Sequence, residues 1–296
     1  MCGIVGLFLK HPRLEPQLGA LTAHMLGTMG SRGPDSAGFA VYGAGVVGET
    51  KLTLRGPGGT DFIGLVTRLR ETIGQASVTL HDTHAVLRLP RDSADAAADW
   101  LAENAPQIAI VGRGERMEMF KEVGLPEKVA ARFGLADMRG THAIGHTRMA
   151  TESAVTINGA HPYSTGPDQC LVHNGSLSNH NAVRRNLRRE GFAFATENDT
   201  EVAAGYLTWR MREGLPLGEA LKASLADLDG FYTFVVGAEN GFGVLRDGIA
   251  CKPAVMAETA DYVAFGSEYR ALAGLPGAET ARVWEPEPAT VYFWER

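Results

Sequence analysis

The sequence predicts an α+β protein in which two sheets pack face to face and helices cover their outer sides. Three observations lead to this prediction. Apolar runs typical of buried strands gather at the start of the chain, at 141–177 and again after residue 230. Segments with apolar residues at helical spacing separate these groups. Strand-rich blocks that alternate with helical blocks are typical of sheets that bury one face against each other and the other against helices.

The first part of the chain predicts strands on both sides of one helix. Residues 3–9 (GIVGLFL) are expected to form a buried strand. Apolar residues between Leu14 and Met29 recur at helical spacing, so an amphipathic helix with its apolar stripe in the core is expected there. A Gly/Pro/Asp turn then precedes a strand at 38–42, and 43–56 is expected to form a second strand pair.

Residues 57–140 differ in sequence pattern from the segments on either side and are expected to be an insertion of mixed α/β character. Thr60 or Asp61 is placed to cap a helix that runs to about Ile73. The other elements expected here are a strand or hairpin at 78–90, a helix at 93–106, a short strand at 107–114 and a helix that includes Met117, Phe120 and Val123.

From residue 141 the pattern is rich in strands again, with no internal repeat. Two strands, a group of helices and then several strands joined by hairpin turns are expected. The expected strands lie at 141–151, 169–177, in four or five pieces over 230–268, and in the tail; the expected helices lie at about 179–190, 200–212 and 217–228.

Composition and charge exclude several classes of protein. The chain has 296 residues, 45% hydrophobic and 21% charged, which suits a globular protein, and a single domain over 1–296 is expected. A net charge of −6 argues against nucleic-acid binding. The basic run Arg184, Arg185, Arg188 and Arg189 is interpreted as a solvated or partner-facing helix surface.

The sequence also lacks signals for a membrane or an oxidising compartment. No apolar run reaches the length of a membrane-spanning helix, and the basic residues near the N-terminus follow the apolar stretch, unlike in a signal peptide. Cys2, Cys170 and Cys251 are too scattered for a disulfide framework or a metal motif. A cytoplasmic enzyme without metal is therefore expected.

Cys2 follows the initiator methionine directly. If Met1 is removed, Cys2 carries both a thiol and a free α-amine, which are a nucleophile and a base on one residue. The alternative is a small apolar residue that begins a strand.

Three further stretches carry groups that suit an amino-acid substrate. Arg148 ends an apolar strand in GHTRMAT, and a guanidinium matches a carboxylate with two hydrogen bonds. Asp199, in TENDTEV, suits an ammonium group. Asn174 and Gly175, in LVHNGSL, offer an amide and a backbone N–H that could hold an oxyanion during acyl transfer.

Each stretch also has an ordinary structural explanation. An arginine at a strand end is usually a surface ion-pair partner, Asn-Gly is usually a turn, and an aspartate before a helix is usually an N-cap. Only the combination of all four stretches favours a catalytic site.

This combination, in this order, resembles the class II glutamine amidotransferase domain, an N-terminal-nucleophile hydrolase. The resemblance runs from residue 2 to about 273 and implies a four-layer αββα sandwich with an insertion at about 57–140. Its motifs are MCGIVG at the start, RGPDSAG at 32–38, GHTRMAT at 145–151, AHPY at 160–163, HNG at 173–175, NDTE at 198–201, LDGFYTFVV at 228–236, RDGIACKPAVM at 246–256 and FGSEYRAL at 265–272.

The resemblance implies a role for each matched residue. Cys2 would be the nucleophile and its α-amine the general base, with a γ-glutamyl thioester as the intermediate. Arg148 would bind the α-carboxylate of glutamine and Asp199 its α-amino group. The Asn174 side chain and the Gly175 backbone N–H would form the oxyanion hole.

Other matched positions receive no direct role. Thr151 and His161 are expected near the pocket, and His146 is expected to support Arg148. Met149 departs from the pattern, because the family commonly has an aromatic residue after the arginine.

The resemblance also implies a partner. The matched strands use nearly all of the sequence after Asp199, which leaves no room for an acceptor domain. The chain looks most like the separate amidotransferase subunits related to glutamate synthase, such as the small subunit of N-methylglutamate synthase. A separate, flavin-bearing synthase subunit would then receive the ammonia in a hetero-oligomer, with no cofactor on this chain. The alternatives are a free glutaminase and a non-hydrolytic structural or channel subunit that retains the fold.

Overall fold

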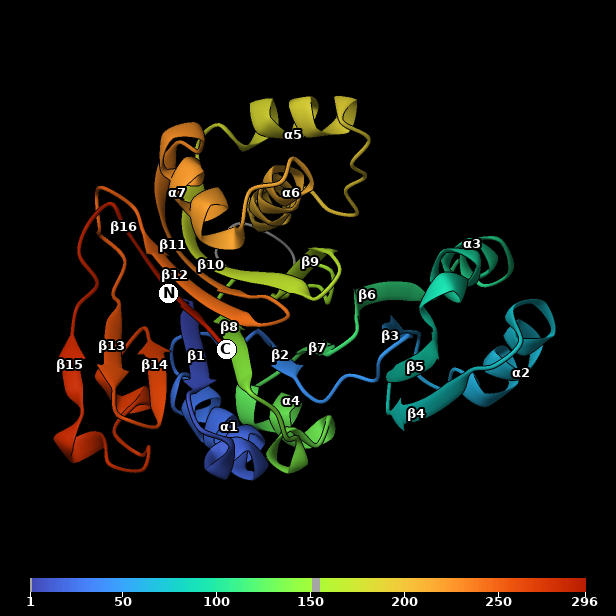
Figure 1. The fold of residues 1–296 in the computed structure, drawn as a ribbon, viewed down its shortest axis with the longest axis horizontal. Helices are drawn as coiled ribbons and strands as arrows, with labels where there is room; N and C mark the ends of the chain where they lie inside the picture. The colour runs from blue at the N-terminus through green and yellow to red at the C-terminus, as the bar shows by residue number, and fades with distance from the viewer. Residues whose placement is uncertain (1, 151–154) are drawn as a thin grey trace.

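Two antiparallel sheets packed face to face form the main body of the computed structural model, which describes residues 2–150 and 155–296 (Figure 1). Within those ranges the larger sheet has seven strands in the order β15-β13-β14-β1-β8-β2-β7, so the N-terminal strand lies at its centre. The strands are β1 (Gly3–Leu9), β2 (Ser36–Tyr42), β7 (Met117–Val123), β8 (His142–Arg148), β13 (Val255–Glu258), β14 (Tyr262–Gly266) and β15 (Arg282–Trp284).

The second sheet carries the strand that contains the HNG motif. In the described part of the chain it has five strands in the order β16-β12-β11-β10-β9, and each neighbouring pair is antiparallel. The strands are β9 (Tyr163–Gly166), β10 (Gln169–Leu177), β11 (Gly230–Gly237), β12 (Gly241–Arg246) and β16 (Thr290–Glu295).

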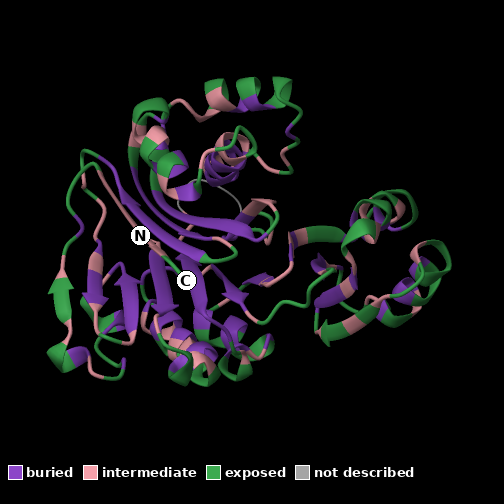
Figure 2. Cartoon of the chain, viewed as in Figure 1, coloured by how far each residue is buried: buried purple, intermediate pink, exposed green. Residues whose placement is uncertain are grey.

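Helices cover the outer face of each sheet. One group packs against the seven-stranded sheet, and α6 and α7 pack against the five-stranded sheet with α5 on α6 (Figure 1). Apolar residues such as Ile4, Val172 and Phe242 fill the space between the sheets, whose central strands are buried (Figure 2). The expected four-layer αββα fold is thereby confirmed. The helices are α1 (Leu18–Thr28), α4 (Pro126–Arg132), α5 (His180–Arg189), α6 (Asp199–Arg212) and α7 (Leu217–Asp227).

The insertion is a separate small sheet with two helices on one face (Figure 1). Its strands follow the order β4-β5-β3-β6 and span 49–114, so it begins and ends earlier than the expected 57–140. The strand pair expected at 43–56 is also wrong, because that stretch holds only one strand, β3, and this strand belongs to the insertion. The elements are β3 (Glu49–Arg55), α2 (Phe62–Ile73), β4 (Ser77–His81), β5 (His84–Pro90), α3 (Ala94–Asn104) and β6 (Ala109–Gly114).

The helix expected around Met117, Phe120 and Val123 is wrong, because these residues form β7. Every residue of β7 pairs with β2, from Met117 opposite Tyr42 to Val123 opposite Ser36. Met117 lies in the core between the sheets, whereas Phe120 lies in the core beneath the helices. Met, Glu and Lys favour helices, but pairing with β2 and burial of both faces override that local preference.

Pairing of β1 on both sides fixes where the N-terminus lies. Gly3 pairs with Thr147 of β8, and Val5 pairs with Gly266 of β14. Cys2 therefore stands at the end of a central, fully buried strand, beside the end of β8. No helix among the described residues has both the length and the apolar character needed to cross a membrane.

Candidate active site

The five residues assigned to the site from the sequence lie around one cavity of about 470 Å³. Cys2 precedes β1, Arg148 ends β8, Asn174 and Gly175 lie in β10, and Asp199 begins α6. A volume of this size is in the usual range for small-molecule sites. The cavity is lined by Cys2, Arg148, Met149, Ala150, His161, His173, Asn174, Gly175, Asn198, Asp199 and Thr200.

The backbone of Cys2 is held by two side chains from distant parts of the chain. Its carbonyl oxygen accepts hydrogen bonds from Arg32 Nε at 3.0 Å and from Asn174 Nδ2 at 3.1 Å. The Cys2 thiol is half-buried and lies 3.8 Å from the Met149 carbonyl oxygen. Because the next peptide N–H, that of Gly3, donates to Thr147 Oγ1 at 3.2 Å, the residue has little freedom to turn.

Arg32 is itself fixed by an ion pair. Its Nη1 lies 2.6 Å from Glu268 Oε1, and Arg270 Nε lies 2.7 Å from the other oxygen of that carboxylate. These guanidinium groups, Arg32 first, lower the pKa of Glu268, so the carboxylate stays charged. The RGPDSAG and FGSEYRAL motifs therefore meet at the carbonyl of Cys2, a contact that sequence spacing did not predict.

Asn174 lies inside β10 and not in a turn, so the turn explanation is wrong. Its amide nitrogen donates to Ser267 Oγ at 3.2 Å as well as to the Cys2 carbonyl, so both of its hydrogens are engaged. Ser267 Oγ in turn accepts from the Ile4 backbone N–H at 2.9 Å. For Asn174 to stabilise an oxyanion, one of its two bonds must be exchanged for the substrate oxygen.

Gly175 adopts a backbone conformation that only glycine tolerates well. Its φ is +143°, and a Cβ at this position would lie 1.9 Å from the Phe231 carbonyl oxygen. The residue pairs with Tyr232 of β11 and is exposed at the cavity.

Asp199 is the first residue of α6, and the cap is its neighbour. Asn198 accepts the Thr200 N–H at 2.9 Å through its side chain, so the N-cap explanation is wrong for Asp199. Asp199 Oδ2 instead accepts the Leu177 N–H at 2.9 Å, and its Oδ1 lies 3.7 Å from His173 Nδ1. The carboxylate is thus anchored by one oxygen at the end of β10 while the residue lines the cavity.

Arg148 is 8% exposed, so a surface position is excluded. A Cβ at Gly159 would lie 3.0 Å from its Nη1, which shows how closely the segment after the strand packs on the guanidinium. A second cavity of about 530 Å³ shares Arg148, Asn198 and Asp199 with the first. These side chains therefore stand where the two cavities meet.

Three buried histidines support the cavity wall. His161 Nε2 and His173 Nδ1 lie 2.7 and 3.0 Å from Thr200 Oγ1. His146 Nε2 lies 3.1 Å from the His173 carbonyl oxygen, and its ring stacks on His161 with centroids 4.0 Å apart. Burial lowers the pKa of all three rings, that of His146 to about 3, so they are neutral at pH 7.

The sequence also predicted that His161 and Thr151 lie near the pocket. His161 lines the cavity as expected, and Thr151 falls outside the described residues. Arg32, Thr147, Thr200, Ser267 and Glu268 surround the site but were not singled out from the sequence, although each lies within a quoted motif. Within 2–150 and 155–296, no three His, Cys, Asp or Glu side chains are arranged to hold a metal ion.

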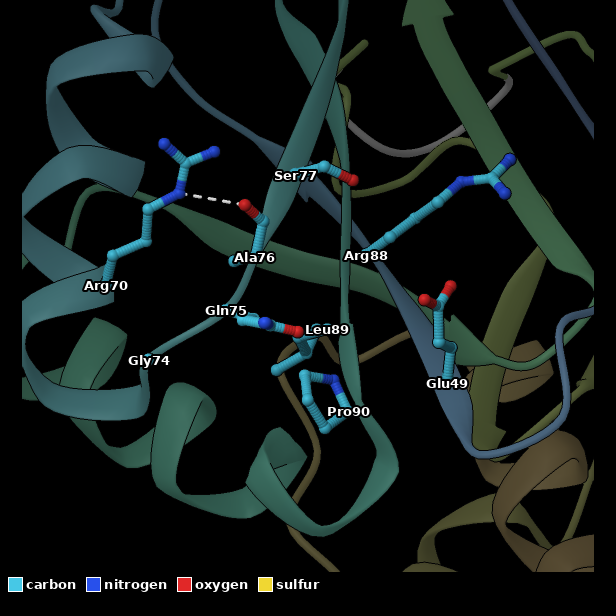
Figure 3. Close-up of a pocket in the computed structure, with 9 residues that line it drawn as sticks. All are labelled: Glu49, Arg70, Gly74, Gln75, Ala76, Ser77, Arg88, Leu89 and Pro90. Carbon is cyan, nitrogen blue, oxygen red and sulfur yellow. Dashed lines mark hydrogen bonds between the residues drawn. The ribbon is translucent and has the colours of Figure 1, made fainter.

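A third cavity, of about 470 Å³, lies in the insertion and contains none of these residues (Figure 3). Arg70 lies at one side, where its Nε donates to the Ala76 carbonyl oxygen at 2.8 Å. Arg88, on another wall, lies 3.5 Å from Glu118 of β7. Ser77 lines this cavity, but none of the five residues assigned to the site from the sequence does, so the Cys2 cavity is the candidate active site.

Two face-to-face sheets between layers of helices form the fold of the N-terminal-nucleophile hydrolases, the class that includes the class II amidotransferases, and Cys2 lies at the cavity of this fold. Residues 146–274 match the glutamine amidotransferase domain family. The chain is 61% identical over all 296 residues to the glutamine amidotransferase-like protein GlxB of Rhizobium meliloti (strain 1021), of which it covers 98%. The chain therefore belongs to the glutamine amidotransferase family.

Two more distant relatives share part of this description. The glutamine–fructose-6-phosphate aminotransferase (isomerizing) of Vibrio vulnificus (strain YJ016) is 33% identical over 129 residues. These residues cover 44% of this chain and 21% of that protein. The glutamine phosphoribosylpyrophosphate amidotransferase of B. subtilis, complexed with ADP and GMP, matches 99% of this chain with 47% of its own. Its TM-score of 0.64 at 20% identity shows a shared fold.

Proposed function

We propose that this chain hydrolyses the side-chain amide of glutamine with Cys2 as the nucleophile, and passes the ammonia to a separate synthase subunit. Arg148 binds the α-carboxylate and Asp199 the α-ammonium group of glutamine. The Asn174 amide and the Gly175 N–H hold the oxyanion. The observation that carries the proposal is that these five groups, dispersed over 198 positions, line a single cavity.

The steps balance without a cofactor on this chain. The α-amine of Cys2, freed by removal of Met1, takes the thiol proton as sulfur attacks the amide carbon. The C–N bond breaks, the amine returns its proton to the leaving nitrogen, and ammonia departs from a γ-glutamyl thioester. Water then adds to the thioester, the C–S bond breaks, and glutamate leaves with the thiol restored.

The fixed position of Cys2 supports this assignment. Arg32 and Asn174 hold its carbonyl group, and β1 holds the residues behind it. A nucleophile fixed in this way needs little reorganisation to reach a bound amide.

The synthase partner is proposed to be of the glutamate synthase or N-methylglutamate synthase type, with any flavin on the partner. The support is the likeness of the sequence to stand-alone subunits of that group. If the chain instead serves as a non-hydrolytic structural or channel subunit, it will bind such a partner without releasing glutamate.

The test measures glutamate released from glutamine by the wild type, Cys2→Ala and Cys251→Ala, each alone and with the co-purified partner. Cys251 is exposed and lies outside the cavity, so its variant is the control. The proposal predicts hydrolysis by the wild type and the control only. Hydrolysis by Cys2→Ala, or by none of the three in either setting, would contradict it.

A further inference from the structure

The four arginines of α5 do not share one environment. Arg185, Arg188 and Arg189 are exposed, as the sequence predicted, but Arg184 is 3% exposed. Its guanidinium bonds three groups: Nη1 contacts the carboxylate of Glu197 and lies 3.1 Å from Asn181 Oδ1, and Nη2 lies 3.3 Å from the Asn198 carbonyl oxygen. Burying a guanidinium is costly unless it is paired, so this position calls for an explanation.

Two of these partners lie in the turn that leads directly into Asp199. The same turn is held from its other side by Glu201, whose carboxylate accepts the N–H groups of Ala195 and Thr196, both at 2.8 Å. Arg184 also lies over the ring of Phe194, with 5.9 Å from Cζ to the centroid. The turn at 195–198 is therefore clamped between a buried cation from α5 and a buried anion from α6.

The helix that carries Arg184 begins where Asp199 is anchored. Asp199 Oδ2 accepts the Leu177 N–H, and His180 Nδ1, in the first turn of α5, lies 2.7 Å from the Leu177 carbonyl oxygen. The chain thus forms a closed loop from the end of β10 through α5 and back to Asp199. The Arg184 side chain connects α5, on one side of this loop, with Glu197 and Asn198 on the other.

Building on the proposed function, we infer that Arg184 is a positioning residue for recognition of the substrate's α-ammonium group. Arg184 does not line the cavity itself, but it bonds Asn198, which does. By bonding the side-chain carboxylate of Glu197 and the backbone carbonyl of Asn198, it determines where the Asp199 carboxylate stands relative to Arg148 and Cys2. Loss of Arg184 should weaken binding of the ammonium end of the substrate and leave the chemistry at Cys2 unchanged.

The experiment compares glutamine with 5-amino-5-oxopentanoate, which is glutamine without its α-amino group. In Arg184→Gln, KM for glutamine should rise by about tenfold while kcat changes by less than about twofold. The kcat/KM for the deaminated substrate should stay within about twofold of wild type, because that substrate does not need Asp199. Arg185 is an exposed neighbour on the same helix, and Arg185→Gln should change KM and kcat for neither substrate.

An equal loss for both substrates would overturn the inference, since a general disturbance of the fold does not distinguish them. An unchanged KM for glutamine would overturn it as well. If Arg184→Gln does not fold, Arg184→Lys is decisive, because an ammonium cannot bond both Glu197 and Asn198 in the same geometry. In Arg184→Lys the KM for glutamine, but not for the deaminated substrate, should rise about threefold. An unchanged KM for glutamine in this variant would contradict the inference. A wild type that hydrolyses no glutamine contradicts the proposed function itself, whereas an active wild type with an unaltered Arg184→Gln contradicts only the role of Arg184.

Discussion

The side-chain nitrogen of Asn174 lies 3.1 Å from the carbonyl oxygen of Cys2, although the two residues are 172 positions apart in the chain. Asn174 lies in β10 of the five-stranded sheet, and Cys2 directly precedes β1 of the seven-stranded sheet. This bond therefore joins the two sheets at the site. It places a hydrogen-bond donor beside Cys2, the proposed nucleophile, and this donor already bonds the Cys2 carbonyl and Ser267.

Replacing Asn174 by alanine should lower kcat for glutamine hydrolysis by about 100-fold to 1000-fold, because one oxyanion donor is lost. KM should change little, since the donor acts on the transition state. The measurement is steady-state glutamate release. Ser267→Ala is the matched control, because it removes the other hydrogen-bond partner of Asn174 and keeps the donor. A larger loss in Ser267→Ala than in Asn174→Ala would contradict this division of roles.

Asp199→Asn should raise KM for glutamine by at least about tenfold, because the ammonium group loses its counter-charge, while kcat falls less. Asparagine keeps an oxygen that can accept the Leu177 N–H, so the fold should be preserved. Kinetics with glutamine, together with a thermal unfolding curve, check this. An unchanged KM in a folded variant would remove the assigned role.

Gly175→Ala should destabilise the protein by about 3 kcal/mol, because the added methyl meets the Phe231 carbonyl oxygen and the backbone conformation is unfavourable for other residues. The free energy of unfolding in urea measures this. Gly58→Ala is the control, since nothing lies within 4 Å of a Cβ there. Equal stability of the two variants would argue that β10 and β11 are not paired as described.

Stability should fall as the pH drops below about 6.5. Burial lowers the pKa of His84, His142 and His146 to about 3, so the unfolded chain binds protons between pH 6.5 and 3 that the folded chain does not. Each of these rings should cost about 1 kcal/mol of unfolding free energy between pH 7.5 and 5.5. Urea unfolding at the two pH values tests this, and His84→Gln should show a smaller loss than the wild type. A stability that is flat over this range would be inconsistent with three buried neutral rings.

Apolar runs in the sequence predicted the layers, whereas the five residues assigned to the site were singled out only by the combination of their motifs and the family that this combination resembles. The runs predicted β1, β8 and β10, and the structure places Cys2, Arg148 and Asn174, from motifs in or next to these strands, around one cavity. The strand at Met117–Val123 was missed because its residues favour helices locally and only pairing with β2 makes a strand. Burial of Arg184 was missed because its partners lie 13 and 14 positions away, beyond the reach of helical periodicity.

The contacts around Cys2 were missed for a similar reason. Arg32 and Glu268 are 236 positions apart, and neither of their motifs indicates that they meet. Long-range ion pairs of this kind depend on how the strands are ordered in the sheet, which a single sequence does not reveal.

Mass spectrometry of the N-terminal peptide tests most directly whether Cys2 is a free N-terminal nucleophile. The protein is examined before and after treatment with a diazoketone analogue of glutamine. We predict that Met1 is absent and that one adduct forms on Cys2, which glutamine prevents. A retained Met1 with an unmodified Cys2 would contradict the account.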